Sequence, residues 1–302
     1  MPDSRTPGAG RPLHAGLGQA SARSLLFTVL AELVYADPAR PIPTAALTDV
    51  LALLGVSEHA ARQAIARAAS AGWITSERDG RRTLWRLSPS TNSLLEAGQS
   101  RVFALTAPQP PWDGQWLSVL LGVSLARGAA RNRLESGLRW AGFGSPVSNV
   151  WITPHTDREQ EARQIITAEG LAESALSMIG RPAGIGMPLD EAIRRAWDLD
   201  AVAASHTELL ARFAGREADD SDESLVGHLE LTDALRRFPY MDPQLPMELL
   251  PDWIGRRAAT VLRDLRRQWA SAAHRRWQSL LDAHGAPAPY GPTVNRVGSH
   301  RA

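Results

Sequence analysis

Glu77-Arg78-Asp79-Gly80-Arg81-Arg82 stands between two short stretches with strand patterns, residues 73–78 and 81–87. An Asp-Gly pair favours a two-residue type I′ turn, so the stretch predicts a β-hairpin with a basic tip. Three short helical patterns precede the hairpin between residues 21 and 71. Three helices followed by a basic hairpin is the order of a winged helix-turn-helix, an architecture that reads DNA.

The three helices are predicted from apolar spacing and from their end residues. Ser21, Thr44 and Ser57 are suitable N-caps, and each precedes apolar residues spaced by three or four. The third helix is expected over residues 58–71 and is closed by Gly72. Its apolar side chains face inward: Ala61, Ala64, Ile65 and Ala68. Four polar side chains remain on the more exposed face: His59, Arg62, Gln63 and Arg67.

That exposed face suits the major groove of DNA. Arginine binds guanine O6 and N7 and glutamine binds adenine N6 and N7, so Arg62 and Gln63 are the candidate base readers. His59, near the start of the helix, is a candidate for contact with a base edge or a phosphate. The alternative is an ordinary solvated face of an amphipathic helix.

Positive charge is concentrated locally. The 302-residue chain has 33 basic residues, all arginine, against 32 acids, a net charge of +1. Between residues 57 and 88, six arginines stand against three acids, which gives +3. Arg78, Arg81 and Arg82 cluster at the hairpin tip, where they can neutralise phosphates. Trp73 and Trp85, on the strands, are expected to pack the hairpin against the helices instead of stacking on bases.

Several classes of function are excluded or disfavoured. Cysteine is absent, which excludes disulfides, thiolate metal sites and cysteine nucleophiles. The sequence contains no HExxH, GxSxG or GxxxxGK motif, so we expect no enzyme activity, cofactor or metal. No apolar stretch approaches the ~20 residues of a membrane span, and the first 19 residues hold no signal-peptide h-region. We therefore expect a cytoplasmic protein with no membrane contact.

Three other groups of polar residues have alternative interpretations. His155 and Asp157 follow a predicted strand and could bind a metal or exchange protons, although a structural role is preferred. The acidic run at residues 219–223 lacks the spacing and the glycine of an EF-hand, so it is interpreted as a solvated loop. Five arginine pairs between residues 194 and 276 could receive an anionic effector or form solvated faces.

The predicted fold class is α+β and multidomain. A disordered leader (1–19) is followed by a winged-helix domain (20–107), a ferredoxin-like α/β sandwich (112–186), a helical C-terminal domain (187–286) and a tail (287–302). In the central part, the predicted elements lack one strand of the β-α-β-β-α-β order. Further helices are expected over residues 91–104, 189–214, 224–237 and 251–284.

Six stretches, taken together, carry a family resemblance. They are residues 21–30 (SARSLLFTVL), 54–64 (LGVSEHAARQA), 72–78 (GWITSER), 139–145 (RWAGFGS), 242–246 (DPQLP) and 250–253 (LPDW). The chain thereby resembles the PaaX family, the repressors of phenylacetate catabolism and their relatives. The resemblance implies a winged helix, a central ferredoxin-like domain similar to a CRISPR-associated ribonuclease, and a helical C-terminal domain.

The same resemblance implies homodimers that repress by occupying promoter DNA and are released by an aryl-acyl coenzyme A, phenylacetyl-CoA. It carries DNA contacts over to the third helix and the hairpin, on Arg62, Gln63, Arg67, Arg78, Arg81 and Arg82. Nuclease activity does not carry over. A metal-dependent nuclease of the related fold needs an acid at the end of its first strand, where this chain reads Gly122-Val-Ser-Leu125.

We therefore expect a transcriptional repressor that binds a palindromic operator in double-stranded DNA as a homodimer. A small acidic effector such as an aryl-acyl-CoA is expected to release it. Two alternatives stay open from the sequence: a metal-dependent nuclease centred on residues 112–180, and a protein-interaction module whose winged helix binds a partner protein.

Overall fold

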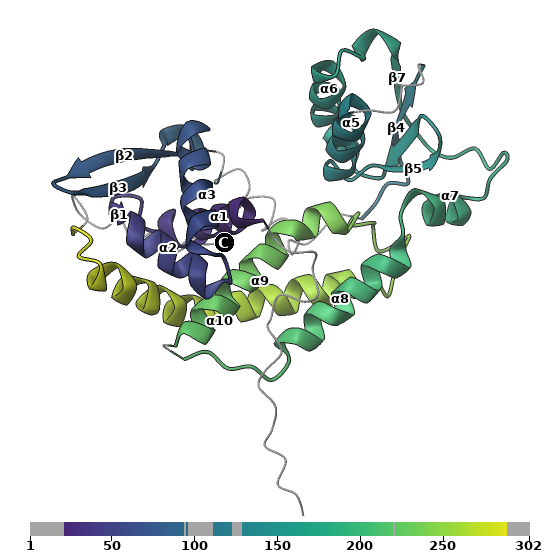
Figure 1. The fold of residues 1–302 in the computed structure, drawn as a ribbon. Coiled ribbons are helices and arrows are strands. Elements are labelled where there is room, and N and C mark those ends of the chain that lie inside the picture. The colour runs from purple at the N-terminus through teal and green to yellow at the C-terminus, as the bar shows by residue number, and fades with distance from the viewer. Residues whose placement is uncertain (1–20, 94, 96–110, 123–128, 220, 289–302) are drawn as a thin grey trace, which may run out of the picture. The chain divides into compact units, whose positions relative to one another are not determined.

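The computed structural model describes residues 21–93, 95, 111–122, 129–219 and 221–288. The chain divides into two compact units, Met1–Asn92 with His274–Ala302, and Ser93–Ala273. Each unit combines helices with one antiparallel sheet, so the mixed helix and sheet content expected from the sequence is confirmed (Figure 1). The predicted leader, the predicted helix beyond residue 95 and the tail from residue 289 lie outside the described residues.

Three helices open the first unit. Helix α1 (Ala22–Val29) is capped by Ser21, whose hydroxyl accepts the Ser24 amide at 3.2 Å, and it continues into a π-helical turn, Leu30–Val34. Helix α2 (Thr44–Leu53) has Pro43 at its N-cap, so the predicted cap Thr44 is instead the first helical residue. Helix α3 (Glu58–Ser70) is capped by Ser57, as predicted.

The apolar face of α3 is buried as its spacing predicts. Ala61, Ala64, Ile65 and Ala68 are at most 4% exposed. The two tryptophans of the hairpin pack within the unit, which confirms their structural role. Trp73 meets Phe27 edge to face at 5.2 Å between ring centroids, and the Trp85 indole donates to the Thr44 hydroxyl at 2.9 Å.

The sheet of the first unit has the order β1-β3-β2, from β1 (Ile42–Pro43), β2 (Ile74–Asp79) and β3 (Arg82–Leu87). Asp79 pairs with Arg82, so the turn consists of Gly80 and Arg81. The predicted Asp79-Gly80 turn is therefore wrong by one residue. Gly80 has φ 57° and Arg81 is not in the positive-φ region, the pattern of a type II′ turn with glycine first.

The end of the last helix belongs to the first unit. Helix α10 (Ile254–Ala283) begins in the second unit, and its residues from His274 onward lie in the first. Polar contacts join this end to α2 and to the loop before β1. His284 Nε2 lies 2.7 Å from Asp49 Oδ2 of α2, and the Arg40 guanidinium donates to Asp282 at 2.5 Å.

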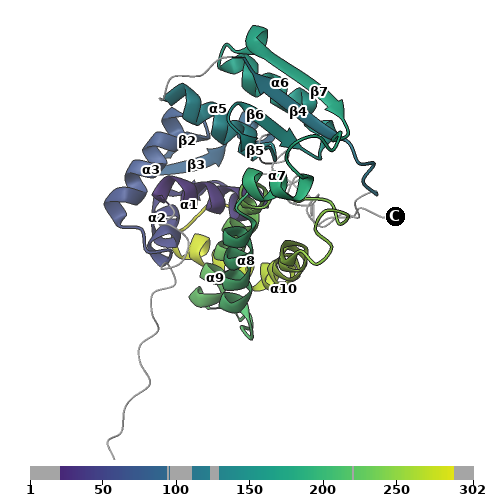
Figure 2. The ribbon, with the colours of Figure 1, turned by 90° about the vertical axis from the view of Figure 1, so that its right-hand side faces the viewer.

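The sheet of the second unit has the order β5-β6-β4-β7, and all its neighbours are antiparallel. Its strands are β4 (Trp116–Leu121), β5 (Gly144–Val147), β6 (Val150–Thr153) and β7 (Ala175–Gly180). Helix α5 (Ala129–Trp140) follows β4, and α6 (Glu159–Ala168) follows β6, which gives the chain order β-α-β-β-α-β (Figure 2). The strand that the sequence did not locate is β5.

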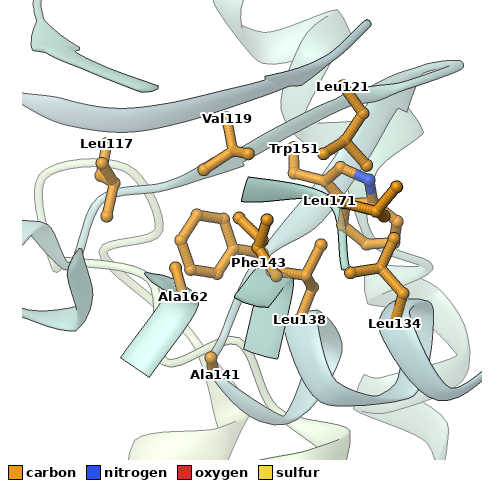
Figure 3. Packing of buried hydrophobic residues seen from close by; sticks show 11 residues of the cluster. Leu117, Val119, Leu121, Leu134, Leu138, Ala141, Phe143, Trp151, Ala162 and Leu171 are labelled. Atoms are coloured by element: carbon orange, nitrogen blue, oxygen red, sulfur yellow. The ribbon is translucent and has the colours of Figure 1, made fainter. Parts of the chain in front are cut away.

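Helices α5 and α6 cover one face of this sheet and build a core with it. Figure 3 shows Phe143, which is fully buried, beside Leu138 and Ala162, and Trp151 beside Leu134. On the opposite face, Trp116 packs against helix α7 (Leu189–Ala196) and the Trp197 that follows it.

The predicted helix over residues 189–214 is wrong in one respect, because the chain forms two helices there. Trp197 has an extended backbone and is buried against Trp116, so it ends α7. Asp198 then caps helix α8 (Leu199–Phe213) by accepting the Ala201 amide at 3.1 Å. Helix α9 (Asp222–Met241) is longer at both ends than the predicted 224–237.

Asp242, directly after α9, is a buried hydrogen-bond centre. Its Oδ2 lies 2.9 Å from His206 Nε2 and accepts the Trp253 indole at 2.7 Å, while Oδ1 accepts the Gln244 amide at 2.7 Å. Asp242 and Trp253 belong to two of the stretches, 242–246 and 250–253, that carry the family resemblance. The structure thus joins both stretches to α8 through one carboxylate.

Candidate nucleic-acid interface

The exposed face of α3 carries a row of hydrogen-bonded polar side chains. Gln63 Nε2 lies 2.8 Å from His59 Nε2, and Arg67 Nη2 donates to Gln63 Oε1 at 2.8 Å. The three residues are spaced by four and all are exposed, so they lie along one side of the helix. We call this set, His59, Gln63 and Arg67, the α3 row. The two contacts join the three side chains into one hydrogen-bonded chain.

Arg62 lies beside the α3 row and is paired with its own helix. Its Nε and Nη2 donate to Glu58 Oε1 at 2.9 and 2.8 Å, and the two side chains are 61% and 71% exposed. An exposed pair of this kind contributes only about 0–1 kcal/mol. Arg62 can therefore leave Glu58 for a guanine edge at little cost.

The hairpin presents its arginines on more than one side. Arg78 and Arg81 are exposed, and neither side chain bonds to another residue in the described part of the chain. Directly paired residues of an antiparallel ladder point to the same face and alternate along it. The pairs Arg78↔Thr83 and Asp79↔Arg82 therefore place Arg78 and Arg82 on opposite faces of the hairpin.

Arg82 is directed to the end of α10. Its Nη1 donates to the backbone oxygens of His284 at 3.2 Å and Gly285 at 3.4 Å. Carbonyl oxygens at a helix C-terminus carry partial negative charge, so they suit a guanidinium. The predicted tip cluster is thus divided: Arg78 and Arg81 stay unbonded, while Arg82 has a partner that lies 202 positions away and that sequence reasoning missed.

Two of the three acids between residues 57 and 88 are paired with arginines. Glu58 binds Arg62, and Glu77 lies 3.5 Å from Arg86 Nε. Arg86 also donates to the Ala39 oxygen from the centre of the sheet. The positive charge that remains available is therefore on Arg67, Arg78 and Arg81, along α3 and at the tip of the hairpin.

His155 and Asp157 do not form a joint site. His155 Nε2 is 3.0 Å from the Pro243 oxygen, whereas the Asp157 side chain is 80% exposed and its ion pair is with Arg158. Burial lowers the pKa of His155 below its ordinary value, against the opposing effect of the Pro243 oxygen. Within the described residues, no group of three or more His, Asp or Glu side chains could hold a metal ion.

The acidic run and several arginine pairs have structural partners. Asp219 accepts hydrogen bonds from the Ser221 amide and from the hydroxyls of Ser221 and Ser224, and these bonds lower its pKa. Arg194 and Arg195 pair with the acids four residues earlier on α7. Arg236 and Arg237 both bind Asp233.

Among the helices of the described residues, none combines the length and the apolar composition that a membrane span requires.

Comparison with known families gives three adjoining matches. Residues 21–91 match the PaaX-like protein family, residues 109–190 match the PaaX protein central Cas2-like domain, and residues 197–279 match the PaaX-like protein C-terminal domain. The chain belongs to the PaaX family, as its sequence resemblance implied.

One curated relative and one solved structure extend this result. The chain is 28% identical over 241 residues to the transcriptional repressor PaaX of Escherichia coli (strain K12), across 75% of this chain and 74% of the relative. It is also similar to the structure of the uncharacterized protein Rv0674 from Mycobacterium tuberculosis. That match has a TM-score of 0.55 and 24% identity and covers 86% of this chain and 98% of the other. The second likeness concerns the fold alone.

Proposed function

We propose that the protein is a DNA-binding transcriptional repressor. The single observation that carries the proposal is the hydrogen-bonded α3 row, followed directly along the chain by a hairpin with two arginine side chains that have no bond to another described residue. In this proposal residues 21–91 form a winged helix-turn-helix, with α3 as the recognition helix and β2–β3 as the wing. The relationship to the E. coli repressor supports the same assignment.

The seven predicted side chains have different roles in this proposal. Arg62 and Gln63 read base edges, Arg67 and His59 support them or reach phosphates, and Arg78 and Arg81 bind phosphates. Arg82 binds a phosphate through Nη1 only when Nη1 leaves the carbonyl oxygens of His284 and Gly285. It therefore contributes less to affinity than its two neighbours at the tip.

The second unit serves as an interaction or effector unit in this proposal. Its strand and helix order and its sheet order support a ferredoxin-like assignment for residues 112–186, followed by a helical domain to residue 286. Strand β4 ends at Leu121 and is followed by Gly122, where a nuclease of the related fold would need an acid. A repressor with this unit has no need of a catalytic metal.

The proposal includes a homodimer, a palindromic operator and a cytoplasmic location. Two recognition helices related by a two-fold axis need half-sites about 34–36 Å apart or a multiple of that distance. An acidic effector such as an aryl-acyl-CoA would release the dimer by favouring a form that binds DNA less tightly.

The test is fluorescence anisotropy with labelled DNA from upstream of the protein's own gene, at two salt concentrations and against random competitor DNA. The parent should bind this DNA more tightly than random DNA, with an affinity that falls as salt rises. The variant Gln63→Ala should lose preference, while Arg163→Gln, on an exposed ion pair of α6, should behave as the parent. Equal affinity of the parent for all sequences would contradict the proposal.

A further inference from the structure

A cavity of about 570 Å³ opens on the second unit between α5, the β5–β6 turn and α7. Its base is apolar: Leu121, Leu134 and Trp151 are 7%, 1% and 4% exposed and belong to the core (Figure 3). A volume in this range suits an organic ligand larger than a simple ion. None of the residues proposed to contact DNA lines this cavity.

Three guanidinium groups line the cavity. Arg131 and Arg139 lie on α5 eight residues apart, with Glu135 between them, and Arg195 lies on α7. Arg131 binds Glu135 at 2.7 Å and Arg195 binds Glu191 at 2.5 Å. Arg139 has no ion pair with any described residue, and its guanidinium lies 5.7 Å from the centroid of the Trp151 ring. The uncompensated positive charge of the cavity is therefore on Arg139.

Close packing brings Arg195 to the cavity. A Cβ atom on Gly144 of β5 would lie 2.7 Å from the Ala196 Cβ and 2.8 Å from the Ala196 oxygen, and would also overlap Trp197. Only glycine lets the end of α7 approach the strand this closely. The residue before Ala196 is Arg195, so this contact fixes the backbone position from which the Arg195 side chain reaches the cavity.

Polar groups of the β5–β6 turn complete the rim. Ser148 and Asn149 line the cavity, and Asn149 has a positive φ of 64° in the turn between β5 and β6. A second, smaller cavity of about 260 Å³ shares Arg139 and is lined by the apolar Phe143, Val202 and Met241, and also by Asp198 and Asp242. Arg139 thus lines both cavities.

We propose that the two cavities bind one phosphate-bearing organic anion, with its phosphate against Arg131, Arg139 and Arg195 and an apolar group beside Phe143. Guanidinium groups recognise phosphate oxygens through paired hydrogen bonds, and Arg139 needs no bond to be broken before it does so. The anion site is argued from this geometry alone. Its role in regulating DNA binding rests on the proposed function.

The test is calorimetric titration of the full-length protein with two probes, inorganic pyrophosphate and coenzyme A. Both should bind the parent, and coenzyme A should bind more tightly because it also has an organic part. Arg139→Gln should weaken both by roughly tenfold or more, as expected for a hydrogen-bonded charge pair. Arg139→Lys keeps the charge and should lie between the parent and Arg139→Gln, and Arg163→Gln on α6 should bind as the parent.

Thermal unfolding of each variant controls for loss of fold, since Arg139 also contacts Trp151. Val202→Trp gives an independent check, because it fills the smaller cavity: it should weaken coenzyme A and leave pyrophosphate unchanged if the organic part occupies that space. The proposal would be overturned if the parent bound neither pyrophosphate nor coenzyme A at about 1 mM. It would also be overturned if the parent and a folded Arg139→Gln variant bound the probes with equal affinity.

Operator binding is measured on the same preparations, which separates this proposal from the proposed function. Intact operator binding without probe binding would remove the anion site and leave the repressor assignment in place. Probe binding without operator binding would remove the repressor assignment and leave the anion site in place. If Arg139→Gln instead loses affinity for DNA, the arginines of the cavity contact nucleic acid and the small-molecule proposal is wrong.

Discussion

His206 Nε2 and Asp242 Oδ2 lie 2.9 Å apart, with the two side chains 0% and 2% exposed. The His206 ring also stacks on Phe238 at 4.4 Å between centroids. A buried carboxylate is stable only when its oxygens are hydrogen-bonded. Here His206, Trp253 and the Gln244 amide supply those bonds, so the end of α9 and the approach to α10 are held by a few polar contacts.

Asp242→Ala should destabilise the second unit by about 3–5 kcal/mol, because it leaves buried donors without their acceptor. The free energy of unfolding from urea titration measures the effect. Asp252→Ala, at an exposed acid nearby, is the matched control and should change stability by less than about 0.5 kcal/mol. A loss below about 1 kcal/mol for Asp242→Ala would show that the buried contacts contribute little net stability.

Gly255→Ala should destabilise the same region without removing any polar group. A Cβ atom at Gly255 would overlap both Asp242 Oδ2 and the Trp253 indole. Overpacking of this kind costs about 1–3 kcal/mol. Near-ultraviolet circular dichroism should report a change in the environment of Trp253, and an unchanged spectrum with unchanged stability would contradict the close approach.

Stability should fall as pH drops below the ordinary His pKa of 6.5, in part because of His155. Burial lowers the His155 pKa in the folded state, so between the folded and unfolded pKa values the unfolded chain binds a proton that the folded chain does not. The contribution of His155 to the free energy of unfolding is complete above pH 6.5 and declines as the pH falls toward the pKa of His155 in the folded state. His155→Asn should flatten this part of the stability curve, measured by urea titration at several pH values.

The control for that experiment is Thr167→Ala, at an exposed residue of α6. It neither adds nor removes a titrating group, so it should leave the pH dependence of stability as in the parent. Identical curves for His155→Asn and the parent would show that His155 does not take part in this dependence.

Arg78→Ala combined with Arg81→Ala should lower the salt slope of DNA binding by about two, since each phosphate contact adds about one. Arg82→Ala should lower it by less than one, because its guanidinium already has carbonyl partners. Anisotropy titrations across several salt concentrations give the slopes. A larger effect of Arg82→Ala than of the double variant would reverse the division of the hairpin tip described above.

Gln63→Ala should weaken binding selectively at one operator position, by about 1–3 kcal/mol for the preferred base. Gln63→Ala should also free the Arg67 guanidinium, because Arg67 loses the acceptor that holds it in the α3 row. Binding to a set of operators with single base substitutions measures the loss at the Gln63 position and any change due to Arg67. A uniform loss over all sequences would place Gln63 among the phosphate contacts.

Local signals allowed the first unit to be predicted well. Ser21 and Ser57 cap helices because their hydroxyls reach amides three residues on, and α3 buries its alanines because their spacing matches the helical repeat. The hairpin was also predicted, with its turn one residue out of place. An Asp-Gly pair suggests a type I′ turn, but Asp79 is held in the ladder opposite Arg82.

The parts that sequence reasoning missed depend on tertiary contacts. Strand β5 contains Gly144 and Pro146, which have low strand propensity, and its glycine is required by the approach of α7. The break after α7 follows from the burial of Trp197 against Trp116. Asp198, which caps α8, is the one local signal of this break that the sequence prediction did not use. The cavity around Arg139 joins two helices and a turn from separate parts of the chain.

The contact of Arg82 with the end of α10 has a thermodynamic consequence. Both oxygens are bound by Nη1 of Arg82, so a phosphate that binds through Nη1 must displace residues 284 and 285. If Arg82 contacts DNA through Nη1, as proposed, phosphate binding and the anchoring of the last helical turn are linked. Each would then weaken the other by the same free energy.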